Sequence, residues 1–141
     1  MNPEDTKSLV KYRIEQAEAA IKDANVLLNS NCTLGSVINR SYYAMFYAAM
    51  ASLQTIGKTP SKHAGVLSLF NQEFVLTGRL SRELGRTIHR AFELRQSADY
   101  AIMPPLDKNA AAAICEDARS FVAAVKSYLE QQSWMPPETK E

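Results

Sequence analysis

Three side chains that could take part in chemistry lie together near the end of a predicted helix, in the segment Arg95-Gln-Ser-Ala-Asp-Tyr100. Arg95 and Asp99 are four residues apart, so on a helix they lie on the same face. Arginine can bind phosphate through two parallel N–H donors, and tyrosine can donate a hydrogen bond or stack on a base. The same residues could instead form an ion pair that steadies the helix end, worth about 0.3–0.5 kcal/mol. The pattern by itself permits either role.

A second polar group borders the most aromatic part of the chain, Tyr42-Tyr-Ala-Met-Phe-Tyr-Ala-Ala-Met-Ala51. Asn39, Arg40 and Tyr43 lie at its start, and polar side chains beside aromatic ones are typical of the edge of a pocket. The structural alternative is that Asn39 bonds the nearby backbone and Arg40 extends into solvent. The aromatic helix itself is either buried on several sides, or buried on one side and used as an interface on the other.

The two histidines are weaker candidates. His63 follows Lys62 near the start of a predicted helix, where a histidine is more often a cap or a packing partner than a catalyst. Arg82 and His89 are seven residues apart and return to one helix face. We take that spacing as coincidental, because the chain has many basic residues.

Composition limits the classes of protein that this chain can be. It has 141 residues, 46% of them hydrophobic and 22% charged, which predicts one globular domain with a substantial core. The net charge of +1 provides no overall basic field, so nucleic-acid binding would need a local basic patch.

Cysteine usage and hydropathy add further expectations. Cys32 and Cys115 have no CxxC or Cys/His spacing, so we expect no disulfide framework, metal site or cofactor. The start, Met1-Asn-Pro-Glu-Asp5, is polar and acidic, unlike a signal peptide. No apolar run approaches the roughly 18–20 residues of a membrane span. We therefore expect a cytoplasmic protein that does not enter a membrane.

Five helices must position these groups. Apolar residues recur at intervals of three and four, and Gly, Pro and capping residues mark the ends. The predicted helices run from Pro3 to Asn29, from a cap at Thr33 to Ile56, from Thr59-Pro60-Ser61 to Thr77, from a cap at Ser81 to before Pro104, and onward from a cap at Asp107. The pattern predicts an all-α, antiparallel up-and-down bundle over residues 1–132 and a flexible tail over residues 133–141.

Three blocks of sequence, in this order, resemble the HEPN domain (higher eukaryotes and prokaryotes nucleotide-binding). They are Arg40-Ser-Tyr-Tyr-Ala-Met-Phe-Tyr-Ala-Ala49, Ser61-Lys-His-Ala-Gly65 and Arg95-Gln-Ser-Ala-Asp-Tyr100. The likeness spans roughly residues 5–130 and is greatest to small stand-alone bacterial and archaeal members. It implies a helical bundle that forms a homodimer and pairs with a minimal nucleotidyltransferase, often as a toxin–antitoxin pair.

The resemblance also implies a site. Many relatives are metal-independent endoribonucleases whose hallmark is an arginine followed, four to six residues on, by a histidine. Arg95 lies at the place of the hallmark arginine, but Tyr100 stands where the histidine is expected. Tyrosine, with an ordinary pKa near ~10, is a poor general base at neutral pH. In some relatives the nucleotidyltransferase adenylylates a tyrosine near this motif, which makes Tyr100 the candidate by position.

We therefore consider three hypotheses for the function of the protein. The first is a nucleotide- or RNA-binding and interaction module; its binding residues are Asn39, Arg40, Tyr43, His63 and Arg95. The second is a ribonuclease toxin in which Arg95 neutralises phosphate charge, Tyr100 donates or orients, and Asp99 or His63 transfers a proton. The third is a non-catalytic helical adaptor.

Overall fold

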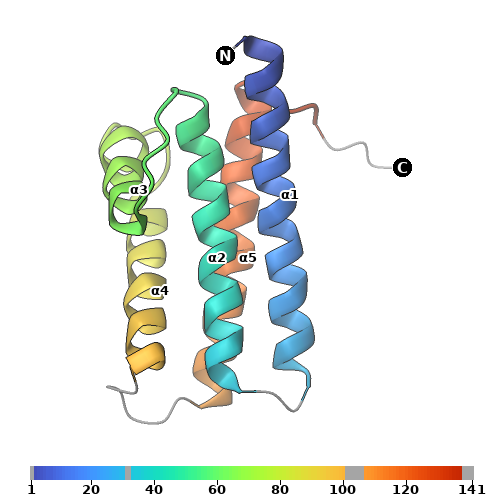
Figure 1. Ribbon diagram of the computed structural model, residues 1–141, viewed down its shortest axis with the longest axis vertical. Coiled ribbons are helices and arrows are strands. Elements are labelled where there is room, and N and C mark those ends of the chain that lie inside the picture. The colour runs from blue at the N-terminus through green and yellow to red at the C-terminus, as the bar shows by residue number, and fades with distance from the viewer. Residues whose placement is uncertain (1, 31–32, 101–106, 138–141) are drawn as a thin grey trace.

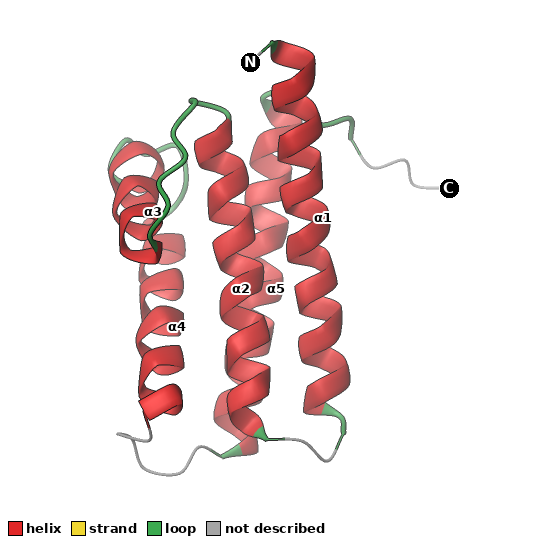
Figure 2. Cartoon of the chain, in the orientation of Figure 1, coloured by secondary structure: helices red, strands yellow, loops and turns green. Residues whose placement is uncertain are grey.

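The computed structural model describes residues 2–30, 33–100 and 107–137, and for residues 98–100 it describes the backbone alone. All its regular elements are helical, and no strand occurs in these ranges, which confirms the predicted all-α class. The elements are shown in Figures 1 and 2. They are α1 (Pro3–Leu28), α2 (Leu34–Gln54), α3 (His63–Phe70), the π-helix η1 (Asn71–Val75), α4 (Arg82–Tyr100) and α5 (Lys108–Gln131).

The helix ends show where local chemistry determines the fold. Pro3 opens α1, and the Asn2 side chain accepts a hydrogen bond from the backbone N–H of Asp5 at 2.8 Å. Asp107 caps α5 by accepting from the N–H of Ala110 at 2.7 Å, as predicted. Thr33 holds the cap position of α2, but its hydroxyl bonds the Ser36 hydroxyl at 2.8 Å and caps no backbone N–H.

The structure moves several predicted boundaries, most clearly at the second and third helices. The second helix ends at Gln54, before the predicted Ile56, because the N–H of Lys58 folds back onto the carbonyl of Leu53 at 3.1 Å. Gly57 makes this turn with a φ of +71°, which favours glycine. The third helix begins at His63 and not at residues 59–61, because the backbone of Lys62 is extended.

Helix α2 is the centre of the bundle. It contacts α1, α3, α4 and α5, so the first of the two readings of its aromatic sequence, burial on several sides, is the correct one. Figure 1 shows α2 with α1 on one side, α4 on the other and α5 behind it. Small buried side chains such as Ala44, Ala48 and Ala51 leave room for close helix approach.

The third helix changes its winding before it ends. In η1 the backbone hydrogen bonds join residues that are five apart in sequence, as in a π-helix. The N–H of Leu76, for example, donates to the carbonyl of Asn71 at 2.8 Å. Phe74 and Val75 turn into the core. Gly85 of α4 permits close packing here, because a Cβ at this position would lie 3.1 Å from Asn71 Oδ1.

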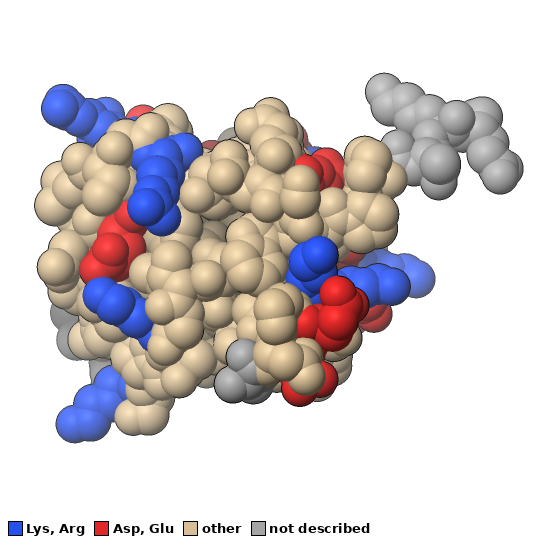
Figure 3. Space-filling model, turned by 90° about the horizontal axis from the view of Figure 1, so that it is seen from above, with Lys and Arg blue, Asp and Glu red and all other residues tan. Residues whose placement is uncertain are grey.

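One end of the bundle carries charges of both signs. Seen from above, basic and acidic side chains are interspersed, with no patch of one sign covering that end (Figure 3). None of the described helices is both long and apolar enough to span a membrane.

The last described residues of the chain return to the bundle. Trp134 and Met135 pack against the core. The predicted flexibility of residues 133–141 stays a prediction.

Candidate functional site

An aromatic cluster of α2 side chains lies against the first residue of α3. The His63 ring stacks on Phe46 with centroids 4.2 Å apart and an interplanar angle of 17°. It meets the edge of Tyr43 at 5.6 Å, and Tyr42 lies 5.7 Å from it. Tyr42 and Phe46 are buried, whereas Tyr43 and His63 are half-buried. The cluster therefore has a buried base and a partly open aromatic face.

Two arginines from different helices lie beside the Tyr43 ring. The guanidinium carbon of Arg40, on α2, lies 5.1 Å from the Tyr43 ring centre. That of Arg95, on α4, lies 5.3 Å from the same ring and 5.5 Å from Tyr42. Both distances to Tyr43 are within the range of a cation–π interaction. We call Arg40, Tyr42, Tyr43, His63 and Arg95 the arginine–tyrosine cluster.

A hydrogen bond of 2.9 Å joins the hydroxyl of Tyr42 to Nδ1 of His63. Burial raises the pKa of Tyr42 well above its usual range, with Arg95 acting in the opposite direction. Burial, and then the positive charge of Arg95, lower the pKa of His63. The phenol therefore stays protonated, and the imidazole is neutral at neutral pH.

The structure brings together most of the predicted binding residues. Asn39 accepts hydrogen bonds from Nε and Nη2 of Arg40 at 3.2 and 3.1 Å, so it orients the guanidinium and does not bond the backbone. His63 lies in the cluster although it is remote in sequence. Asp99 and Tyr100 belong to the last turn of α4, and their side chains lie outside the described residues.

The second arginine–histidine spacing is not part of this cluster. His89 is exposed, and its Nε2 lies 2.8 Å from Oε1 of Glu93 on α4. Arg82 is exposed at the start of the same helix. Both side chains line a separate groove between η1 and α4.

Two members of the aromatic cluster were not among the predicted binding residues, although Tyr42 belongs to the polar and aromatic segment from Asn39 to Tyr43 that the sequence marks as a candidate. Tyr42 and Phe46 stand out in the sequence only as part of an aromatic helix, and their four-residue spacing is the signal that they share a face. Phe92 of α4 lies 5.8 Å from Tyr42 and was not predicted. It precedes Arg95 by three residues, so the two side chains share the face of α4 that lies against α2.

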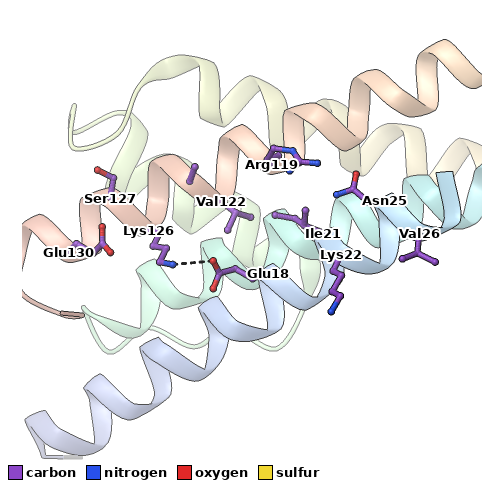
Figure 4. A pocket seen from close by; sticks show the side chains of 11 residues that line it. Glu18, Ile21, Lys22, Asn25, Val26, Arg119, Val122, Lys126, Ser127 and Glu130 are labelled. Carbon is purple, nitrogen blue, oxygen red and sulfur yellow. Dashed lines mark hydrogen bonds and ion pairs between the residues drawn. The ribbon is translucent and has the colours of Figure 1, made fainter. Parts of the chain in front are cut away.

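A groove between α1 and α5 has a different chemistry. It encloses about 550 Å³, and Glu18, Lys22, Arg119 and Lys126 are among its lining residues (Figure 4). Glu18 and Lys126 form an ion pair across it at 3.1 Å. We call it the α1–α5 groove; its charges are of both signs, so it is no obvious anion site.

The described residues contain no group of three His, Cys, Asp or Glu side chains that could hold a metal ion. Cys115 is a buried free thiol that donates to Asn25 Oδ1 at 3.2 Å, and Cys32 lies outside the described residues. The side chains of the arginine–tyrosine cluster can attract an anion, stack on a base, and transfer a proton through a neutral imidazole.

The fold and the cluster place the chain in the class of small all-α proteins. Comparison with known proteins identifies its family. The HEPN domain matches residues 10–128, so the chain belongs to the HEPN domain family. The resemblance found in the three sequence blocks is thereby confirmed.

Two relatives illustrate the likeness. A UPF0332 protein of Thermotoga maritima is 36% identical over 126 residues, covering 89% of this chain and 95% of its own. A protein of Methanocaldococcus jannaschii named "Putative toxin MJ0605" is 35% identical over 127 residues, covering 90% of this chain and 93% of its own. The likeness therefore extends over almost the full length of all three chains.

Proposed function

We propose that this HEPN protein binds nucleotides or single-stranded RNA through the arginine–tyrosine cluster. The observation that carries the proposal is the convergence of Arg40 and Arg95 on one tyrosine ring, at 5.1 and 5.3 Å. Two guanidinium groups can bind neighbouring phosphate oxygens, and a half-exposed tyrosine can stack on a base. Within the described residues no carboxylate forms an ion pair with Arg40.

The test is the affinity of the purified protein for a fluorescently labelled single-stranded RNA, measured by anisotropy in EDTA. Arg95→Ala should weaken binding about tenfold or more, since a charge-assisted hydrogen bond is worth ~1.5–3 kcal/mol. The slope of log affinity against log salt should fall by about 0.7 for each phosphate that the variant no longer neutralises.

The matched control is Arg82→Ala, which removes an exposed arginine from the same helix but outside the cluster. Its affinity should equal that of the unchanged protein. Equally weakened binding in the two variants would show that binding follows overall charge and would refute a site at Arg95.

A second candidate function is metal-independent RNA cleavage. The observation that favours it is His63, a neutral imidazole whose pKa is lowered by burial and by Arg95. In that case His63 would take the proton of the ribose 2′-OH as its oxygen bonds to the adjacent phosphorus, and Arg95 would stabilise the phosphate charge. The bond from phosphorus to the 5′-oxygen would break, and that oxygen would take a proton from water. Cleavage in EDTA should then disappear in both Arg95→Ala and His63→Gln. No cleavage by the unchanged protein, or equal cleavage by all three, would leave RNA binding as the function.

We also propose a cytoplasmic homodimer that pairs with a minimal nucleotidyltransferase in a toxin–antitoxin-like system. The family membership and relatives named as candidate toxins support this proposal. Light scattering would give the mass of the purified protein, and co-expression with a nucleotidyltransferase encoded by an adjacent reading frame would test pairing. A monomer that does not co-purify with that protein would refute it.

A further inference from the structure

A groove between α3–η1 and α4 combines an apolar floor with a basic rim. It encloses about 670 Å³, a volume typical of ligand sites. Its floor contains Leu67, Phe70, Val75, Ile88 and Phe92. We call it the α3–α4 groove, and we propose that it docks an amphipathic helix of a partner protein whose apolar face is flanked by carboxylates.

The rim carries positive charge along one edge. Arg82, Arg86 and His89 recur at intervals of four and three residues, so they follow one face of α4, and the two arginines supply its positive charge. Arg86 pairs with Glu83 at 3.5 Å, and His89 Nε2 lies 2.8 Å from Glu93 Oε1; neither glutamate lines the groove. Among the described residues that line the groove there is no Asp or Glu. The α1–α5 groove, in contrast, includes Glu18 and Glu130 beside its basic residues. Arg82 and Arg86 therefore favour an acidic occupant for the α3–α4 groove more than the mixed charges do for the α1–α5 groove.

The apolar floor favours a polypeptide over a nucleic acid. Phe70 and Ile88 are buried, Leu67 and Phe92 are half-buried, and Leu76 at the rim is 74% exposed. A helix that covers the exposed parts of Leu67, Leu76 and Phe92 removes apolar area from water, which a phosphate backbone cannot do. This is the usual arrangement when an amphipathic helix binds in a groove between two helices.

The dimensions suit a short helix. The lining residues of α4 extend from Arg82 to Phe92, eleven residues whose ten steps span about 15 Å at ~1.5 Å per residue. That length matches roughly three turns of a docked helix. Partner leucines at intervals of three and four residues would face the floor, and glutamates beside them would face Arg82 and Arg86.

Local backbone structure forms the groove wall. The π-helix η1 supplies Asn71 and Val75, and such windings are frequent at functional sites. Gly85 lets α4 lie against this wall, since a Cβ there would approach the Val75 side chain to 3.3 Å. Phe92 lines the groove and also lies 5.8 Å from Tyr42, so a docked helix would lie beside the arginine–tyrosine cluster without occupying it.

The probe is a fluorescent 18-residue synthetic helix with leucines on one face and glutamates flanking them. A second peptide has lysine in place of every glutamate, and a short single-stranded poly(U) RNA serves as the nucleic-acid probe. The intact protein should bind the glutamate peptide at least about tenfold more tightly than the lysine peptide. Equal binding of the two peptides would overturn the proposal.

Variants locate the binding. Arg82→Glu combined with Arg86→Glu should weaken the glutamate peptide about tenfold or more, and Leu76→Ser should weaken it too. The matched control is Lys22→Glu with Arg119→Glu in the α1–α5 groove. Arg119 and Arg86 are both exposed, and each pairs with a glutamate three residues before it, at 3.3 and 3.5 Å. Circular dichroism would verify that every variant folds.

Equally weakened peptide binding in the control would overturn the proposal, because the peptide would then sense only net charge. Binding of poly(U) that depends on Arg82 and Arg86, with no peptide binding there, would assign the groove to nucleic acid and also overturn it. Arg95→Ala should leave peptide binding unchanged. Failure of the peptide-docking proposal can therefore be distinguished from failure of the RNA-binding proposal, which Arg95→Ala tests.

Discussion

At the scale of single residues, Tyr43 is where positive charges from two helices converge. Arg40 lies three residues before it on α2, and Arg95 reaches it from α4. Two guanidinium groups beside one ring are the arrangement that the proposed anion site needs. Asn39 holds the Arg40 guanidinium in place through two hydrogen bonds. These contacts support the proposal that the cluster binds a negative group.

The hydrogen bond between Tyr42 and His63 can be measured through stability. Tyr42→Phe keeps the buried ring and removes the hydroxyl, so the free energy of unfolding should fall by about 0.5–1.5 kcal/mol in urea titrations. Tyr47→Phe is the matched control, on a half-buried tyrosine of the same helix. It should change stability by less than about 0.5 kcal/mol. Equal effects would mean that the 2.9 Å hydrogen bond contributes nothing.

His63 should make the stability depend on pH. Its pKa is lowered in the folded state, so below its ordinary value of 6.5 the unfolded chain takes up a proton before the folded one does. The free energy of unfolding should therefore fall as the pH drops from 6.5 toward the lowered pKa. Urea titrations at several pH values should show a smaller fall for His63→Gln than for His89→Gln. The same fall in both would contradict the predicted role of His63.

At the scale of elements, two residues hold helix cap positions, but only one of them bonds a backbone N–H. These residues are Asp107 and Thr33. Asp107→Ala removes the 2.7 Å bond to Ala110 N and should lower the free energy of unfolding by about 1 kcal/mol. Thr33→Ala should cost less, because the Thr33 hydroxyl bonds a side chain and no backbone N–H. Urea titrations of both variants would check this order. A larger destabilisation by Thr33→Ala would contradict it.

The sequence predicted the helices well because their signals are local. Periodic apolar residues, Pro3 and the cap at Asp107 lie within the elements that they define. The π-helix was not predicted, since its winding depends on packing between η1 and Gly85 of α4. The late start of α3 was missed too, because the extended backbone of Lys62 has no clear sequence signal.

At the scale of the whole molecule, a net charge of +1 means that anion binding depends on where the charges lie. The family resemblance indicated Arg40, His63 and Arg95 one by one. Only the fold brings them together, because α3 and α4 both pack on the central helix α2. Tyr42 and His63, twenty-one residues apart, bond each other for that reason. No spacing pattern within one helix could predict this hydrogen bond.

The central claim is that Arg40 and Arg95 form one anion site around Tyr43, and a double-mutant cycle tests it most directly. RNA affinity would be measured for the unchanged protein, Arg40→Ala, Arg95→Ala and the double variant. Because the two arginines share a partner ring, the cycle should give a coupling energy of at least about 0.5 kcal/mol. A parallel cycle of Arg40 with the remote Arg82 should be additive. Unchanged affinity in either cluster variant, or purely additive effects of Arg40→Ala and Arg95→Ala, would contradict the claim.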